Sequence, residues 1–171
     1  MQPGQQQQQP APQGQAQPGA PAAPPPGQAH GDWVERCTPN PPPGASPPPP
    51  GKQEACFLIQ ELVDQESGRP LLKITVGFFG QERQTAAVIA TPLGVQLTYG
   101  ILISVDGKEI NRVPYQICEP NGCQAVLRMS DAAVAAFKAG NQAEARVEVR
   151  GRERGLPISL RGFTAGFTAI Q

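Results

Sequence analysis

The chain has 171 residues, with 14 basic and 14 acidic side chains and a formal net charge of zero. A neutral chain has no global electric field that would attract nucleic acid or an acidic membrane surface. No run approaches the roughly 18 apolar residues that are needed to span a bilayer. The length suits one ordinary domain.

The first 30 residues differ in composition from the rest. They contain ten Gln, eight Pro and no Asp, Glu, Lys or Arg. Such a segment cannot bury enough apolar surface to offset its conformational entropy. We therefore expect a disordered Gln/Pro-rich tail over 1–30 and a folded domain over 31–171. The start, MQPGQQQQQP, lacks the basic and apolar regions of a secretory signal, so we expect that an exported form carries a signal absent from this sequence.

Alternating or apolar runs predict the strands of the domain, and turn residues separate them. Between the first two strands lies a Pro-rich insertion loop, residues 38–55, which could project as a polyproline-II finger or act as a spacer. Asp106-Gly107 is a strong type I′ turn signal inside the longest run. In chain order, the predicted strands cover 33–37, 56–63, 71–78, 85–92, the hairpin over 100–118, and then 123–129, 143–150 and 156–163.

One helix is predicted among these strands, over 131–139. Ser130 is a good N-cap, Asp131 suits the first turn, and Gly140 follows the last residue. The segment GFTAGFTA, residues 162–169, is interpreted as a terminal strand or turn. Short strands without β-α-β alternation predict an all-β fold, an antiparallel β-sandwich that is immunoglobulin-like in general architecture, with one short connecting helix.

The four cysteines allow three pairings. Glu119-Pro120-Asn121-Gly122 fits a type I turn, which places Cys118 and Cys123 opposite each other on a hairpin, at a distance that a disulfide can bridge. Cys37 is then left to pair with Cys56.

Two other uses of the cysteines remain open. A structural zinc site usually has two to four residues between the cysteines of each pair, whereas these pairs enclose four and 18. A thioredoxin-like redox site needs Cys-x-x-Cys at the start of a helix. Two disulfides would indicate an oxidising compartment: the periplasm, the outer membrane surface or the extracellular medium.

Catalytic chemistry finds little support in the sequence. The only histidine, His30, lies in the predicted tail, so a Ser/His/Asp or Cys/His system lacks its base. Arg150, Arg152 and Arg154 lie at a predicted hairpin tip and could bind a polyanion, although a solvated turn is the simpler interpretation.

Five stretches in a fixed order resemble the invasion-associated locus B family of alphaproteobacterial proteins. The resemblance covers 31–165. It implies an exported all-β sandwich without catalytic residues, linked in pathogens to the invasion of host cells. The Gln/Pro-rich start and the Pro-rich insertion depart from the family pattern. The stretches are GDWVERC (31–37), CFLIQELVDQESGRPLLKI (56–74), TPLGVQLTYGILISVDG (91–107), VPYQICEPNGCQAVLRM (113–129) and ISLRGF (158–163).

We therefore expect an exported, non-catalytic interaction protein of the bacterial envelope, without cofactor or metal. Its expected partner is an envelope or host-surface protein or a polyanion, and not nucleic acid. The alternatives are a zinc-binding or redox protein and an envelope chaperone or polyanion-binding domain.

Overall fold

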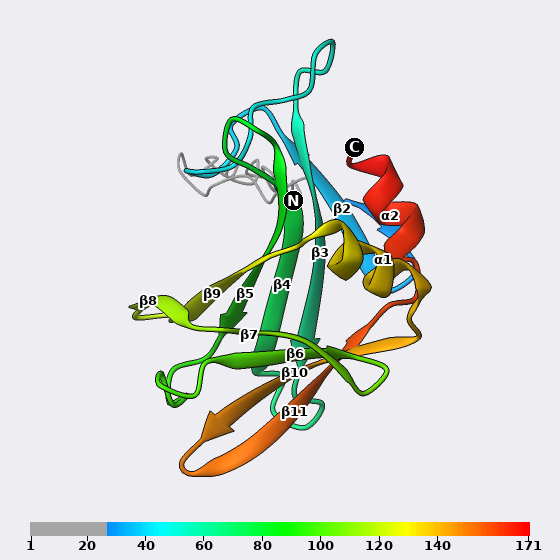
Figure 1. Ribbon diagram of the computed structural model, residues 1–171. Coiled ribbons are helices and arrows are strands. Elements are labelled where there is room, and N and C mark those ends of the chain that lie inside the picture. Colours follow the sequence, from blue (N-terminus) through cyan, green and yellow to red (C-terminus); the bar gives the residue numbers. More distant parts are fainter. Residues whose placement is uncertain (1–26) are drawn as a thin grey trace, which may run out of the picture.

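The computed structural model describes residues 27–171, so the part of the predicted tail over 1–26 lies outside the described residues. The described chain forms two antiparallel sheets that pack face to face, with two short helices at one end (Figure 1). In Figure 1 the strands of the smaller sheet run across those of the larger sheet. This arrangement confirms the predicted antiparallel β-sandwich.

The larger sheet has seven strands and the smaller sheet has four. The larger sheet runs in the order β1 (Gln28–His30), β2 (Trp33–Thr38), β3 (Ala55–Val63), β4 (Pro70–Phe79), β5 (Gln84–Thr91), β9 (Gly122–Arg128) and β8 (Tyr115–Glu119). The smaller sheet runs in the order β11 (Arg152–Ser159), β10 (Gln142–Val149), β6 (Ile101–Val105) and β7 (Lys108–Val113). The helices are α1 (Asp131–Ala139) and α2 (Phe163–Ala169). Within the described residues, neither helix has the length and apolar content to cross a membrane.

The core lies between the two sheets because alternate residues of each strand point inward. On β4, Leu72, Ile74 and Val76 are buried, as the alternation in the sequence predicted. On β10, Ala143, Ala145 and Val147 are buried, while the charged residues between them lie on the outer face. The period of two in the sequence therefore assigns the inner face of both sheets correctly.

The predicted hairpin over 100–118 forms three strands that are divided between the two sheets. Asp106 and Gly107 have φ values of 48° and 79°, which agrees with the predicted type I′ turn between β6 and β7. After Pro114, however, the chain leaves the smaller sheet, and β8 pairs with β9 in the larger one. Proline cannot donate a ladder hydrogen bond, so it is a natural place for the pairing to change.

The interpretation of residues 162–169 as a strand or turn is wrong, because this segment forms α2. Phe163, Gly166 and Phe167 have the i, i+3, i+4 spacing of one helix face, and all three are buried. Phe163 packs against Trp33, with ring centroids 5.2 Å apart. The preceding strand also ends earlier than predicted, at Ser159 rather than at residue 163. The core therefore includes a helix that was not predicted from the repeated GFTA pattern.

Residues 28–30 were assigned to the tail, but they form β1 and pair with β2. His30 therefore belongs to the folded domain and lies opposite Trp33 in the sheet register. The carbonyl of Arg161 accepts a hydrogen bond from the backbone N–H of Asp32, at 3.1 Å, which holds the β1–β2 turn against the segment before α2.

The Pro-rich loop does not project freely along its whole length. Ala45 forms an isolated bridge with Phe79, and the hydroxyl of Ser46 donates to the carbonyl of Gly80 at 2.6 Å. The guanidinium of Arg83 donates to the carbonyl of Pro47 at 2.9 Å. The middle of the loop is therefore bound to the turn between β4 and β5.

A polar network joins the larger sheet to the end of β11. The Asp32 carboxylate accepts hydrogen bonds from the Arg161 guanidinium and from the hydroxyl of Ser159, at 2.6 Å for the hydroxyl. The side-chain oxygen of Gln60 accepts a hydrogen bond from the backbone N–H of Ser159. The Trp33 indole N–H donates to the backbone carbonyl of Ser159. The hydrogen bonds from Arg161 and then Ser159 lower the pKa of Asp32 from 3.8 to about 2.

We expect Gly162→Ala to destabilise the fold more than Gly107→Ala. Both glycines have positive φ, 87° and 79°, so each alanine bears a backbone cost of about 1–2 kcal/mol. Only at Gly162 would a new Cβ collide with backbone, the carbonyl of His30, which adds roughly 1–3 kcal/mol. Urea unfolding of both variants measures the difference. Equal losses in the free energy of unfolding would show that the close approach of β1 to Gly162 does not contribute to stability.

The acid stability of the protein should depend on Asp32. Because its pKa is depressed in the folded state, the ion pair stabilises the fold above about pH 4, and this contribution is lost as the pH falls toward 2. The urea midpoint of Asp32→Asn should therefore lie below that of the wild type at neutral pH and converge with it near pH 2. Glu54→Gln is the control, because Glu54 is exposed and has no ion pair among residues 27–171. A difference that is independent of pH would contradict this assignment.

Candidate functional site

Both cysteine pairs expected from the sequence are disulfides in the structure. Cys37 and Cys56 are directly opposite each other on β2 and β3, with Cα atoms 3.9 Å apart. Cys118 and Cys123 are opposite each other on β8 and β9, with Cα atoms 4.0 Å apart. Each bond therefore joins two neighbouring strands of the larger sheet, and the second closes the hairpin whose turn is Glu119–Gly122.

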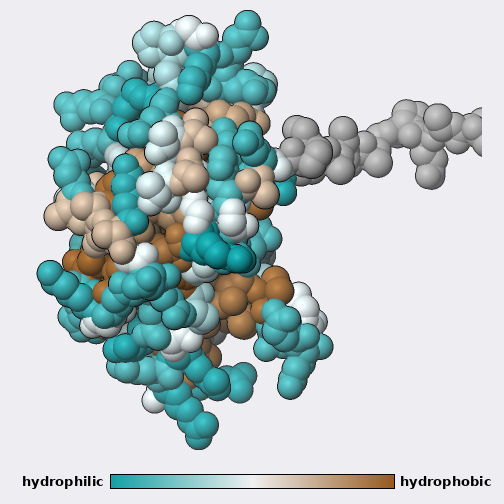
Figure 2. Space-filling model, turned by 90° about the vertical axis from the view of Figure 1, so that its right-hand side faces the viewer, coloured by the Kyte–Doolittle hydropathy of each residue, from teal (hydrophilic) through white to brown (hydrophobic). Residues whose placement is uncertain are grey.

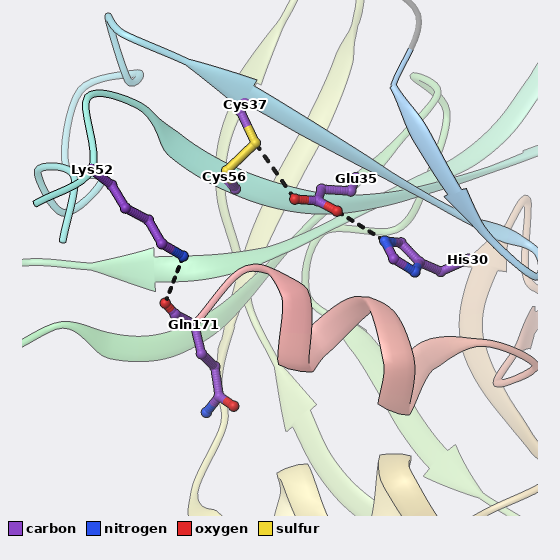
Figure 3. Close-up of a disulfide and its surroundings, with 6 residues drawn as sticks. All are labelled: His30, Glu35, Cys37, Lys52, Cys56 and Gln171. Carbon is purple, nitrogen blue, oxygen red and sulfur yellow. Dashed lines mark hydrogen bonds and ion pairs between the residues drawn. A yellow bond between two sulfur atoms is a disulfide. The ribbon is translucent and has the colours of Figure 1, made fainter.

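The sulfur atoms are not available as metal ligands in this state. Glu35, Cys37 and Cys56 come close enough to be considered as a ligand set, and Glu35 Oε1 lies 3.6 Å from Cys37 Sγ. A zinc ligand must be a thiolate, however, and a sulfur atom in a disulfide is neither charged nor protonated. The dashed line from Cys37 to Glu35 in Figure 3 is therefore a contact and not a true hydrogen bond. This geometry favours structural disulfides over the zinc or redox interpretation.

Glu35 lies between this disulfide and His30, whose imidazole points to the Glu35 carboxylate (Figure 3). The Nε2 atom is 2.9 Å from Glu35 Oε2, and both side chains are mostly buried. Among the described residues, Glu35 is the only side chain that hydrogen-bonds to this ring. The pair therefore has no serine or thiol nucleophile within hydrogen-bonding distance, and it acts as a polar contact between β1 and β2.

The three arginines of the candidate polyanion site are divided by the structure. Arg150 and Gly151 form the turn between β10 and β11, and Arg150 has a φ of 51°. Arg152 and Arg154 lie on β11 itself, opposite Val149 and Val147. The prediction that all three lie at the tip is wrong for Arg152 and Arg154. Because β11 begins directly after the two-residue turn, the alternation of side chains along the strand decides which face Arg152 and Arg154 lie on.

Near its turn, the hairpin places two arginines on one face and two glutamates on the other. Directly opposed residues of an antiparallel pair share a face, so Arg152 and Arg154 lie on the same face as the inward valines. Glu148 and Glu153 oppose each other on the outer face, where Glu153 accepts a hydrogen bond from the Tyr99 hydroxyl at 2.7 Å. This hydrogen bond raises the pKa of Tyr99. Among residues 27–171, Arg150, Arg152 and Arg154 form no ion pair.

An apolar opening between the two sheets lies next to these arginines, at the end of the sandwich opposite the helices. We call it the mouth. It has a volume of about 460 Å³. Figure 2, which views the molecule from the right-hand side of Figure 1, shows hydrophobic side chains between hydrophilic ones in the middle and lower part of that face. The mouth is lined by Asp64, Leu71, Thr91, Pro92, Leu93, Val95, Val147, Val149, Arg154, Gly155 and Leu156.

The walls of the mouth come from three separate segments. The loop after β5 is held against the hairpin by a bridge between Val95 and Val149 and by a hydrogen bond of 2.8 Å from the N–H of Gln96 to the carbonyl of Glu148. Leu71 comes from the start of β4. Of the four large hydrophobic side chains that are exposed among the described residues, Leu93 (56% exposed) lines the mouth. Val63 (40%) and Leu97 (53%) are near lining residues in the sequence, next to Asp64 and two positions after Val95.

The acidic residue of the mouth is already engaged. Asp64 accepts hydrogen bonds from the backbone N–H and the hydroxyl of Ser67, at 2.8 Å and 2.6 Å, and these lower its pKa. Its carboxylate therefore stabilises the turn between β3 and β4, and it does not pair with Arg154.

Sequence reasoning identified the arginines but did not identify the mouth. The signal that could have indicated it is the apolar content of TPLGVQLTYG, residues 91–100, which forms a loop and not a strand. Leucines in a loop that follows a strand have no sheet face to bury them. The sequence alone does not say which segments of other strands they meet.

Comparisons with known proteins agree on one family. The family model described as "Invasion associated locus B (IalB) protein" matches residues 33–171. Two invasion protein B homologues, from Brucella abortus strain 2308 and from Brucella abortus biovar 1 strain 9-941, are each 25% identical over 119 residues, 68% of this chain and 68% of the relative.

A solved structure supports the same fold. The crystal structure of invasion associated protein B from Bartonella henselae aligns with a TM-score of 0.69 and 19% identity, over 84% of this chain and 93% of that one. At this identity the alignment shows a shared fold. With the family match over residues 33–171, it follows that this chain belongs to the invasion associated locus B family.

Proposed function

We propose that this chain is an exported, non-catalytic binding protein of the bacterial envelope that contributes to the invasion or adhesion of host cells. Family membership is the observation that carries this proposal, since the matched relatives are named as invasion proteins. The expected partner is an envelope or host-surface protein or a polyanion, and the mouth with Arg152 and Arg154 is the proposed contact surface.

The location in the envelope is supported by the disulfides. All four cysteines are paired. Such bonds form and persist in the periplasm, at the cell surface or outside the cell, whereas cytosolic thiols are kept reduced. The disulfides therefore support the proposed location in the periplasm, at the outer membrane surface or in the medium.

A binding role is also supported by the environment of the titratable groups. His30 contacts Glu35, Asp32 is paired with Arg161, and Asp106 accepts hydrogen bonds from the backbone N–H groups of Asn141 and Gln142. Each of these groups is engaged in holding two segments of the fold together. An enzyme that uses nucleophilic catalysis would need a base and a nucleophile facing a common pocket. The mouth is instead lined mainly by aliphatic side chains.

The purified protein should contain no free thiol under denaturing, non-reducing conditions. Replacing Cys37 and Cys56 together by Ala should lower the free energy of unfolding by roughly 3.3 kcal/mol, because the disulfide closes a ring of about 20 residues. The matched double replacement of Cys118 and Cys123 by Ala removes a bond that closes a ring of about six residues. It should lower the free energy of unfolding by roughly 2.2 kcal/mol. Thiol titration and urea unfolding measure both. Four free thiols with one bound zinc would instead support the metal interpretation.

Deletion of the gene should reduce the number of bacteria recovered from inside cultured host cells. Complementation with the wild-type gene should restore it. Complementation with a variant carrying Arg150→Ala, Arg152→Ala and Arg154→Ala should restore it only in part, if the mouth is the contact surface. Wild-type invasion by the deletion strain would contradict the proposed role for this protein.

A further inference from the structure

We propose that the mouth binds a phosphorylated acyl lipid, with the acyl chain between the two sheets and the phosphate on Arg152 and Arg154. This inference rests on the proposed function in one respect only, that the protein acts by binding at this end of the sandwich. It goes further by naming the chemical class of the ligand.

The apolar half of the ligand is indicated by the walls of the mouth. Its volume of about 460 Å³ lies in the range of ordinary small-molecule sites, which are mostly apolar with a few polar groups. Leu71, Leu93, Val95, Val149 and Leu156 face this space from three segments. Aliphatic walls of this kind gain by removing a hydrocarbon chain from water, at about 25 cal/mol for each Å² that is buried.

The anionic half is indicated by the positions of the arginines. Arg154 lines the mouth, and Arg152 lies two residues before it on the same face of β11, roughly 6–7 Å away along the strand. Neither has an ion-pair partner among residues 27–171. Arginine forks bind phosphate oxygens in pairs, and a phosphate monoester carries about −1.5 to −2 charges at neutral pH. Two unpaired guanidiniums therefore match one such headgroup.

Among the described residues, no carboxylate forms an ion pair with these two arginines. Asp64 stays ionised, because the hydrogen bonds from Ser67 lower its pKa, but it does not pair with Arg154. Glu148 and Glu153 lie on the opposite face of the hairpin. A soluble polyanion would use the arginines but leave the leucines of the mouth in water. An uncharged lipid would fill the mouth but leave the arginines without a partner. An amphiphile with both parts uses all of these side chains together.

Binding of fluorescently labelled lysophosphatidic acid to the full, oxidised chain tests this inference, at lipid concentrations below those that form micelles. We expect saturable binding. Labelled lysophosphatidylcholine, whose headgroup has no net charge, should bind with an affinity that is lower by a factor of about ten or more. Inorganic phosphate at equal concentration should not displace the lipid, because it lacks the acyl chain.

Two variants and two controls locate the site. Arg152→Ala with Arg154→Ala should weaken lysophosphatidic acid binding by about tenfold or more. Leu93→Asp should abolish it, since it places a carboxylate at the exposed edge of the mouth. Ile117→Asp is the matched control, because Ile117 is 53% exposed but lies on β8. Arg128→Gln controls for the loss of one exposed arginine outside the mouth. Both controls should bind like the wild type.

The inference is overturned if the wild type does not bind the lysolipid, if binding is unchanged in the arginine pair and in Leu93→Asp, or if free phosphate competes equally well. Its failure can be told apart from failure of the proposed function. A protein that supports invasion of host cells without binding the lipid would disprove only the ligand. A protein that binds the lipid in a strain that needs no such protein for invasion would disprove only the biological role.

Discussion

The packing of Phe163 is the interaction on which the closed end of this sandwich depends. Its ring lies edge-on to Trp33 of β2, with centroids 5.2 Å apart, and also contacts Phe137 of α1 and Phe167 of α2, at 5.4 Å and 5.6 Å. One side chain thus joins the larger sheet to both helices. Aromatic contacts of this geometry add to the stabilisation from area burial alone. The network from Asp32 to Arg161 then holds the chain that leads into α2.

The two ends of the sandwich differ because only one has this aromatic cluster. At the end where the two helices lie (Figure 1), the buried rings of Trp33, Phe137, Phe163 and Phe167 pack together in the core. At the mouth, the lining consists of leucines, valines and a proline, together with Asp64, Arg154 and a few small residues. The β10–β11 hairpin carries Arg152 and Arg154 along the open edge. Because one end is filled and the other is open, the open end is the place where we propose that another molecule binds.

The disulfides and the proposed contact surface have separate roles. Both bonds join neighbouring strands within the larger sheet, and none of the four cysteines lines the mouth. The bonds limit the freedom of the unfolded chain and indicate where the protein works. The mouth and its arginines form the contact surface that we propose for binding.

The sequence by itself determined the elements whose signals are local. Alternation predicted the inner faces of β4 and β10, Ser130 marked the start of α1, and Asp106-Gly107 marked a tight turn. The turn Glu119–Gly122 was enough to pair Cys118 with Cys123, and the other disulfide followed by elimination. These predictions depend on residues a few positions apart, whose geometry is set by backbone sterics and pleat.

Only the tertiary structure decided the features that depend on distant partners. The GFTA repeat could form a strand or a helix, and burial of Phe163 against Trp33 selects the helix. Residues 28–30 have no strand signal of their own, but β2 offers them an edge to pair with. The register of β10 with β11 places Arg152 and Arg154 beside the mouth and the glutamates on the other face. Register and sheet order bring together residues that the sequence keeps far apart, so the mouth could be found only in the folded chain.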